Sequence, residues 1–113
     1  MTVTAMLSVA PLDSPDVDFD AQIAKAIDAL DDYDVRYETN PMETTIEADG
    51  LDEVFAAAQG ATEAVDASRV TTNLKIDHFR EEDLAVEEKV DRVEAHLGRD
   101  AASPGARNGG AEQ

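Results

Sequence analysis

One segment restricts the fold of this chain more than any other, the stretch RVTTNLKID from Arg69 to Asp77. Successive side chains of a strand point to opposite faces, so the alternation along this stretch predicts a strand with one apolar and one polar face. The apolar side would hold Val70, Thr72, Leu74 and Ile76, and the polar side would hold Arg69, Thr71, Asn73, Lys75 and Asp77.

A second segment, PMETTIE from Pro41 to Glu47, has the same two-faced pattern. A strand that only filled a core would not need a whole face of hydrogen-bonding groups. Arg69 and Lys75 are also two of only nine basic residues in a chain whose net charge is −17. The two segments together predict a polar sheet surface that binds something.

Composition limits the class of protein. The 113 residues suffice for one domain with a modest core, and without cysteine the chain can form neither disulfides nor thiolate metal sites. The acidic excess, 26 Asp and Glu against nine Lys and Arg, argues against a nucleic-acid partner. No apolar run approaches the roughly 20 residues of a membrane span, and the first residues do not resemble a signal peptide. We therefore expect a soluble, cytoplasmic protein without a membrane partner.

The acidic charge has two readings, disorder or a carboxylate-coated surface from a high-salt cytoplasm. The apolar residues keep regular periods up to about residue 97, which favours the second, halophilic reading. Self-repulsion is tolerable there because the Debye length falls to about 3 Å at 1 M salt.

Hydrophobic periodicity predicts four strands, at residues 3–9, 35–39, 44–48 and 69–77, with Pro11 ending the first. A helix capped by Asp18 carries an apolar stripe, a second spans residues 51–65 with a soft spot at Gly60, and a third spans about 82–97. The stripe of the first helix consists of Ile23, Ala26, Ile27 and Leu30.

This order predicts the α+β fold class, a ferredoxin-like βαββαβ arrangement with a four-stranded antiparallel sheet plus a C-terminal helix. Both main helices should cover one face of the sheet and leave the polar face partly bare. We expect residues 1–97 to form this domain and residues 98–113, which are rich in Gly and Ala and lack an apolar period, to form a disordered tail.

Three segments resemble a known family, the small ferredoxin-like thiamine-binding proteins of archaea and bacteria. PMETTIE is similar to the family's Pro-Met-Gly-Thr-x-Ile-Glu segment, and RVTTNLKID to its Arg-Val-x-Thr-x-Ile/Leu-Lys-Ile-Asp segment. LSVAP, residues 7–11, resembles its opening strand. The resemblance covers roughly residues 3 to 97. It departs at Glu43 and Ala48, where the family usually has Gly, and at Phe79, where the family has a basic residue that Arg80 could replace.

The resemblance implies a homo-oligomer, a dimer or a tetramer, that binds thiamine or a related pyrimidine without catalysis and without another cofactor. Thiamine needs a hydrogen-bond acceptor for its aminopyrimidine, apolar walls, and compensation for its thiazolium cation. The residues that we expect to bind it, with no metal ligand among them, are Ser8, Met42, Thr44, Thr45, Glu47, Arg69, Thr71, Asn73 and Lys75.

Several of these residues also have a purely structural explanation. Glu47 could make charge-assisted hydrogen bonds to the ligand, or an ion pair with Lys75 or Arg69 worth about 0.2–1 kcal/mol. By strand parity, Thr44 should point with Ile46 toward the helices. For Met42 the favoured alternative is packing in a core or an interface, and for any one threonine the commoner explanation is β-propensity alone.

Other polar residues are expected to play no part in a site. His78 and His96 are predicted to be surface residues, because neither has a partner at metal-ligand spacing. The aspartates between residues 13 and 20 lack the glycine and closing glutamate of a calcium loop.

Two functions from different classes therefore remain open. The first is non-catalytic binding of thiamine or a related pyrimidine at the polar sheet face. The second is an oligomeric interaction or regulatory module that uses the same face between subunits. An enzyme is the weakest reading, because Glu47 with Lys75 is the one acid/base pair that we can nominate.

The acidic composition predicts salt-dependent stability. Low salt leaves the repulsion among carboxylates unscreened, so the melting temperature should be lower in 0.1 M KCl than in 2 M KCl. Thermal melts followed by circular dichroism measure this. Equal melting temperatures would remove the halophilic reading.

Overall fold

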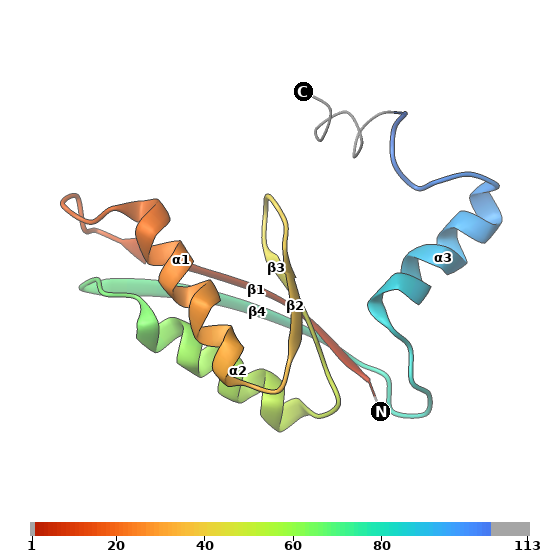
Figure 1. The fold of residues 1–113 in the computed structure, drawn as a ribbon, viewed down its shortest axis with the longest axis horizontal. Coiled ribbons are helices and arrows are strands. Elements are labelled where there is room, and N and C mark those ends of the chain that lie inside the picture. Colours follow the sequence, from red (N-terminus) through yellow and green to blue (C-terminus); the bar gives the residue numbers. More distant parts are fainter. Residues whose placement is uncertain (1, 105–113) are drawn as a thin grey trace. The chain divides into compact units, whose positions relative to one another are not determined.

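The computed structural model describes residues 2–104, which fall into two compact units that divide after Asp83. The second unit contains α3 (Val86–Leu97). The first contains four strands and two helices, coloured red to green in Figure 1: β1 (Val3–Leu12), α1 (Phe19–Ala29) with a closing 3-10 turn (Leu30–Asp32), β2 (Arg36–Thr39), β3 (Thr44–Ala48), α2 (Leu51–Ala64) and β4 (Arg69–His78).

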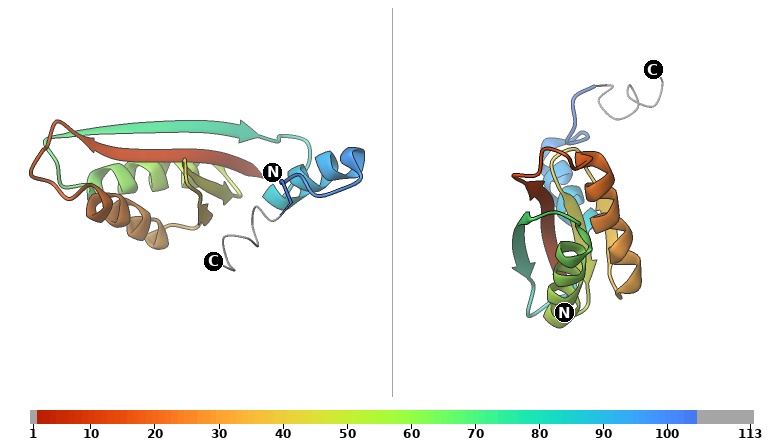
Figure 2. Two further views of the ribbon diagram at one scale, coloured as in Figure 1. Left: turned by 90° about the horizontal axis from the view of Figure 1, so that it is seen from above. Right: turned by 90° about the vertical axis from the view of Figure 1, so that its left-hand side faces the viewer.

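The four strands form one antiparallel sheet in the order β2-β3-β1-β4. Both α1 and α2 lie on the same side of this sheet (Figure 2). The predicted ferredoxin-like α+β fold with an added C-terminal helix is therefore confirmed. Among the described residues, no helix combines the length and apolar character needed to cross a membrane.

The core lies between the sheet and the two helices. It is built from the odd-numbered residues of β1, from Ile46 and Ala48 of β3, and from small side chains of α2. Alanines on α2 let its backbone approach the sheet closely. Gly60 has a specific reason, because a Cβ atom there would lie 2.2 Å from the Tyr33 hydroxyl oxygen. Gly60, which the sequence predicts to weaken the second helix, is therefore the position at which the Tyr33 ring packs on α2.

The ends of the helices follow local hydrogen bonds. Asp18 caps α1 as predicted, since its carboxylate accepts a hydrogen bond from the Ala21 N–H at 3.2 Å. The prediction that the third helix starts near Glu82 was wrong. The Glu88 carboxylate accepts from the Ala85 N–H at 3.0 Å, and this contact fixes Ala85 as the residue before the helix.

The stripe of α3 consists of apolar side chains, and Val90, Val93 and Leu97 are exposed. Gly98 ends the helix in the left-handed conformation, with φ 73°. Residues 99–104 contain neither helix nor strand. The rest of the predicted disordered tail, residues 105–113, lies outside the described residues.

The prediction that Pro11 ends the first strand was also wrong, because β1 continues to Leu12. The Phe79 N–H donates to the Thr2 carbonyl, and the β1–β4 register stays constant from Val3 to Leu12. Even-numbered residues of β1 therefore direct their backbone groups toward β4, and odd-numbered residues direct theirs the other way. The backbone nitrogen of Pro11, which carries no hydrogen, faces away from β4. No hydrogen bond of the β1–β4 ladder is therefore lost, and the strand can contain this proline.

Candidate functional site

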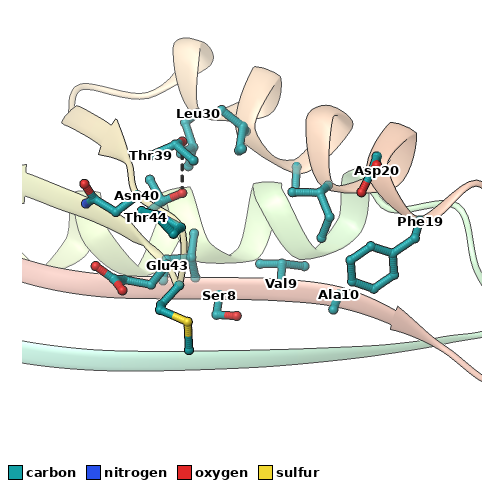
Figure 3. A pocket seen from close by; sticks show the side chains of 16 residues that line it. Ser8, Val9, Ala10, Phe19, Asp20, Leu30, Thr39, Asn40, Glu43 and Thr44 are labelled. Carbon is teal, nitrogen blue, oxygen red and sulfur yellow. Dashed lines mark hydrogen bonds between the residues drawn. The ribbon is translucent and has the colours of Figure 1, made fainter. Parts of the chain in front are cut away.

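A cavity of about 290 Å³ lies beside β1, and its walls come from three separate parts of the fold (Figure 3). This volume is close to the lower end of the usual range for small-molecule sites, about 300–1,000 Å³. The lining residues are Leu7 to Ala10 on β1, then Phe19, Asp20, Ile23, Ala26, Ile27 and Leu30 from α1 and its closing turn, and Thr39 to Thr44 from the β2–β3 turn.

The cavity exists because two neighbours of β1 differ in length. β4 pairs with β1 along its whole length, from Val3 to Leu12, whereas pairing with β3 ends at Leu7 opposite Thr44. The segment of β1 beyond Leu7 therefore has a free edge on the side that β3 would otherwise occupy. The short β2–β3 hairpin and α1 surround this edge without pairing with it.

The backbone of Val9 lies at this free edge. As an odd-numbered residue of β1, Val9 directs its N–H and C=O away from β4, while its side chain is buried. Val9 also lines the cavity. One hydrogen-bond donor and one acceptor, held by a rigid strand, are thus available to a molecule in the pocket.

The walls of the pocket are mostly apolar but are not closed. Phe19 is 53% exposed and Met42 is 83% exposed, so two large apolar side chains of the lining are accessible to solvent. The polar lining includes Ser8, Asn40 and the Thr44 hydroxyl, which lies 3.2 Å from the Thr39 hydroxyl. Apolar walls with a few fixed polar groups are typical of small-molecule sites.

The opposite face of the sheet is uncovered by helices and carries mainly polar side chains. By register and alternation, this open sheet face holds Arg36 and Glu38 of β2, Thr45 and Glu47 of β3, the even-numbered residues of β1, and Arg69, Thr71, Asn73, Lys75 and Asp77 of β4. One row crosses the whole sheet, from Arg36 through Glu47 and Thr4 to Asp77.

Glu47 is held within this row by Arg36. The Arg36 Nε donates to Glu47 Oε1 at 2.9 Å, and its Nη2 lies 3.5 Å from Asp49 Oδ1. The hydrogen bond to Glu47 is the main reason why the pKa of Arg36 is raised. The Glu47 side chain is only 13% exposed, so its carboxylate is partly withdrawn from solvent.

The nine predicted binding residues do not form one cluster. Met42 and Thr44 line the pocket, and six others lie on the open sheet face; Ser8, an even-numbered residue of that face, also borders the pocket at the free edge of β1. Thr44 is buried toward the helices, as strand parity predicted. Arg36, the ion-pair partner found for Glu47, was not among those considered, and Arg69 pairs with Asp13 at 2.7 Å.

Sequence reasoning missed Phe19, Asn40 and the Val9 backbone. Phe19 precedes Ile23 by four residues, so it extends the apolar stripe of α1 by one turn beyond what the sheet covers. That extra turn was a usable signal. Nothing in the sequence shows where β3 stops along β1, and the site at Val9 depends on that.

Among residues 2–104, no three His, Asp or Glu side chains are grouped in a way that could hold a metal ion.

The chain matches the family model described as thiamine-binding protein over residues 5–94. A protein of Methanothermobacter thermautotrophicus, named only as a UPF0045 protein, is 40% identical over 98 residues, which cover 84% of this chain and 99% of that protein.

Solved structures agree with this match. The crystal structure of a hypothetical protein from Methanocaldococcus jannaschii has a TM-score of 0.73 at 34% identity and covers 81% of this chain and 95% of that one. A Thermotoga maritima protein, described as a candidate thiamine biosynthesis or salvage protein, has a TM-score of 0.69 at 25% identity and covers 82% and 99%.

The free edge predicts a distinct pattern of amide hydrogen exchange. The N–H groups of Leu7 and Ala10 lie in sheet ladders and should exchange slowly, whereas the Val9 N–H should exchange at least about tenfold faster. Exchange followed by NMR on the unliganded protein measures this, and Ala10 is the internal control. Protection of Val9 equal to that of Leu7 would mean that the edge is covered.

Proposed function

The chain belongs to the thiamine-binding protein family, and from this premise we propose that it binds thiamine, or a related aminopyrimidine, in the pocket at the free edge of β1. The proposed role is binding without catalysis. This location differs from the polar sheet face that the sequence alone favours.

The observation that carries the proposal is the backbone donor and acceptor of Val9 inside an apolar pocket. An aminopyrimidine has a ring nitrogen that accepts a hydrogen bond next to an amino group that donates one. This edge complements the N–H and C=O of a single strand residue, much as a neighbouring strand would. The ligand would thus take the place that β3 leaves empty.

The pocket walls suit a flat heterocycle. Phe19 offers an exposed aromatic ring at the mouth, and Ile23 and Ile27 of α1 supply an apolar surface. Thr44 offers a hydroxyl group at the β3 wall. Recognition through the backbone inside mostly apolar walls supports binding.

Calorimetry with thiamine tests the location of the site. Replacing Phe19 with Leu removes the aromatic wall, so affinity should fall about three- to tenfold. The matched control is Phe55→Leu, because Phe55 is also a helical phenylalanine, is 55% exposed, and does not line the pocket. That variant should bind as the unmutated protein does.

A third variant separates the pocket from the open sheet face. Glu47→Gln should leave thiamine affinity unchanged if the ligand occupies the pocket. A fall of ten- to a hundredfold in Glu47→Gln, with Phe19→Leu unaffected, would move the site to the sheet face, where a charge-assisted hydrogen bond of about 1.5–3 kcal/mol would be lost. Absence of thiamine binding by the unmutated protein would contradict the proposal itself.

We also propose that the open sheet face docks a second copy of the chain. Its charged side chains balance, three bases (Arg36, Arg69 and Lys75) against three acids (Glu38, Glu47 and Asp77), although the whole chain carries −17. Two such acidic molecules repel each other over most of their surfaces, and a neutral mosaic of both signs lets them approach. This observation favours a dimer, or a tetramer built from dimers.

Light scattering at high salt tests self-association, and we expect a particle of two or four chains of 12.1 kDa each. Lys75→Glu gives the open sheet face a charge of about −2 and should shift the particle toward the monomer. Lys25→Glu makes the same change on the exposed surface of α1 and should not. A single-chain mass for the unmutated protein would refute docking.

A further inference from the structure

The two outer edges of the sheet differ in length. β2 forms one edge and is four residues long, whereas β4 forms the other edge and is ten residues long (Figure 2). A very short edge strand is one of the ways in which proteins prevent pairing with other chains. β4 contains neither a proline nor a bulge that would serve the same purpose, since it pairs with β1 without interruption. β4 is therefore the edge to which another strand can be added.

The backbone of β4 presents one side of a hydrogen-bond ladder to the outside of the sheet. Odd-numbered residues of β4 bond to the even-numbered residues of β1. The even-numbered residues from Val70 to His78 therefore direct their N–H and C=O groups away from β1. Within residues 2–104, no strand pairs with this side of β4. A strand from another molecule could bond to all of these groups in register.

The charge of β4 is opposite to that of the chain. Its charged side chains are those of Arg69, Lys75 and Asp77, two bases against one acid, in a chain whose net charge is −17. Two copies of so acidic a molecule repel each other over most of their surfaces. Repulsion is smaller where each copy presents β4, so the strand that has the longer edge is also the one that a second copy can approach.

We infer that the β4 edges of two copies of this chain pair antiparallel about a twofold axis at Asn73, so that their sheets join into one. This register places Arg69 of each copy opposite Asp77 of the other, and Lys75 opposite Thr71. The contact is isologous, since each copy contributes the same strand. The edge of β4 is separate from the open sheet face, and the inference does not rest on the proposed function.

Backbone direction and charge select this register. Residues whose backbone groups point outward must oppose each other, so even-numbered residues of one copy oppose even-numbered residues of the other. Two such registers align almost the whole strand, one with the axis at Asn73 and one with the axis at Leu74. The first alone brings opposite charges together, Arg69 with Asp77. Arg69 contacts Asp13 at 2.7 Å, and its guanidinium has further N–H donors for a second carboxylate.

The helix side of β4 fits the same register. Val70 and Ile76, both partly buried against the core, would oppose each other across the joint and continue the apolar layer from one copy to the next. A twofold axis perpendicular to the sheet also keeps the open sheet faces of both copies on one side. The edge contact is therefore compatible with docking through the open sheet face, and the two contacts together would build a particle of four chains.

Single cysteines test the register directly, because the chain has none of its own. Asn73→Cys would place two thiols in a pair without hydrogen bonds between the copies, where Cα atoms lie about 4.5 Å apart. A disulfide joins Cα atoms that are about 4.4–6.8 Å apart. With oxidised glutathione as the oxidant, Asn73→Cys should form a disulfide-linked dimer at least about tenfold faster than Thr71→Cys or Lys75→Cys, as measured on non-reducing gels.

Thr71→Cys and Lys75→Cys are the matched controls, because they lie on the same strand and the same face. Each would lie about 13 Å along the strand from its own counterpart and should not cross-link alone. Mixed together, the two proteins should cross-link to each other, because residue 71 opposes residue 75 in this register. The mixture also tests the contact without changing Asn73, should the Asn73→Cys protein fail to fold.

The other outcomes would overturn the inference. Equal rates for the three single variants would indicate random collision, and faster cross-linking of Thr71→Cys or Lys75→Cys alone would indicate another register. Monomeric Asn73→Cys protein with the circular dichroism spectrum of the folded chain, together with a mixture that does not cross-link, would show that the β4 edges do not meet. Docking through the open sheet face cannot imitate the expected result, because sheets packed face to face lie about 10 Å apart.

Discussion

The difference in length between the two ladders of β1 is the constraint on which the site depends. β1 and β4 pair over ten residues, whereas β3 follows β1 for only five. A strand paired on both sides has no backbone groups to offer, and a strand unpaired on both sides would not hold its shape. The β1 segment beyond Leu7 has one paired and one free side, so it is both rigid and available. The remaining walls only have to approach this edge.

The two faces of the sheet differ in the side chains that they carry and in what those side chains contact. On the helix side, alanines of α2 and the close approach of Tyr33 to Gly60 give a small but closed core. On the other side, acids and bases are present in equal number, so their charges cancel within a molecule that is otherwise strongly acidic. The Arg36–Glu47 pair belongs to this mosaic, since it joins β2 to β3 and keeps Glu47 partly shielded from solvent.

Pro11 illustrates how a local rule can be correct and its application wrong. Proline cannot donate to a ladder, and the sequence alone makes it a strand terminator. Because the phase of the β1–β4 ladder turns Pro11 toward the free edge, no hydrogen bond is lost and the strand runs on. The late start of α3 has a similar origin, since the Glu88–Ala85 contact sets the first turn more strongly than the apolar stripe does.

The sequence by itself determined the order of the elements, the buried and polar faces of each strand, the capping of α1 and the family. These features depend on local periodicity and on short motifs, which are readable within a few residues. Only the tertiary structure decided that Met42 and Thr44 separate from the other predicted site residues, that Glu47 meets Arg36, and that Val9 faces an open edge. Each of these depends on the register and extent of pairing between strands far apart in the chain, and alternation along one strand cannot fix where its partner stops.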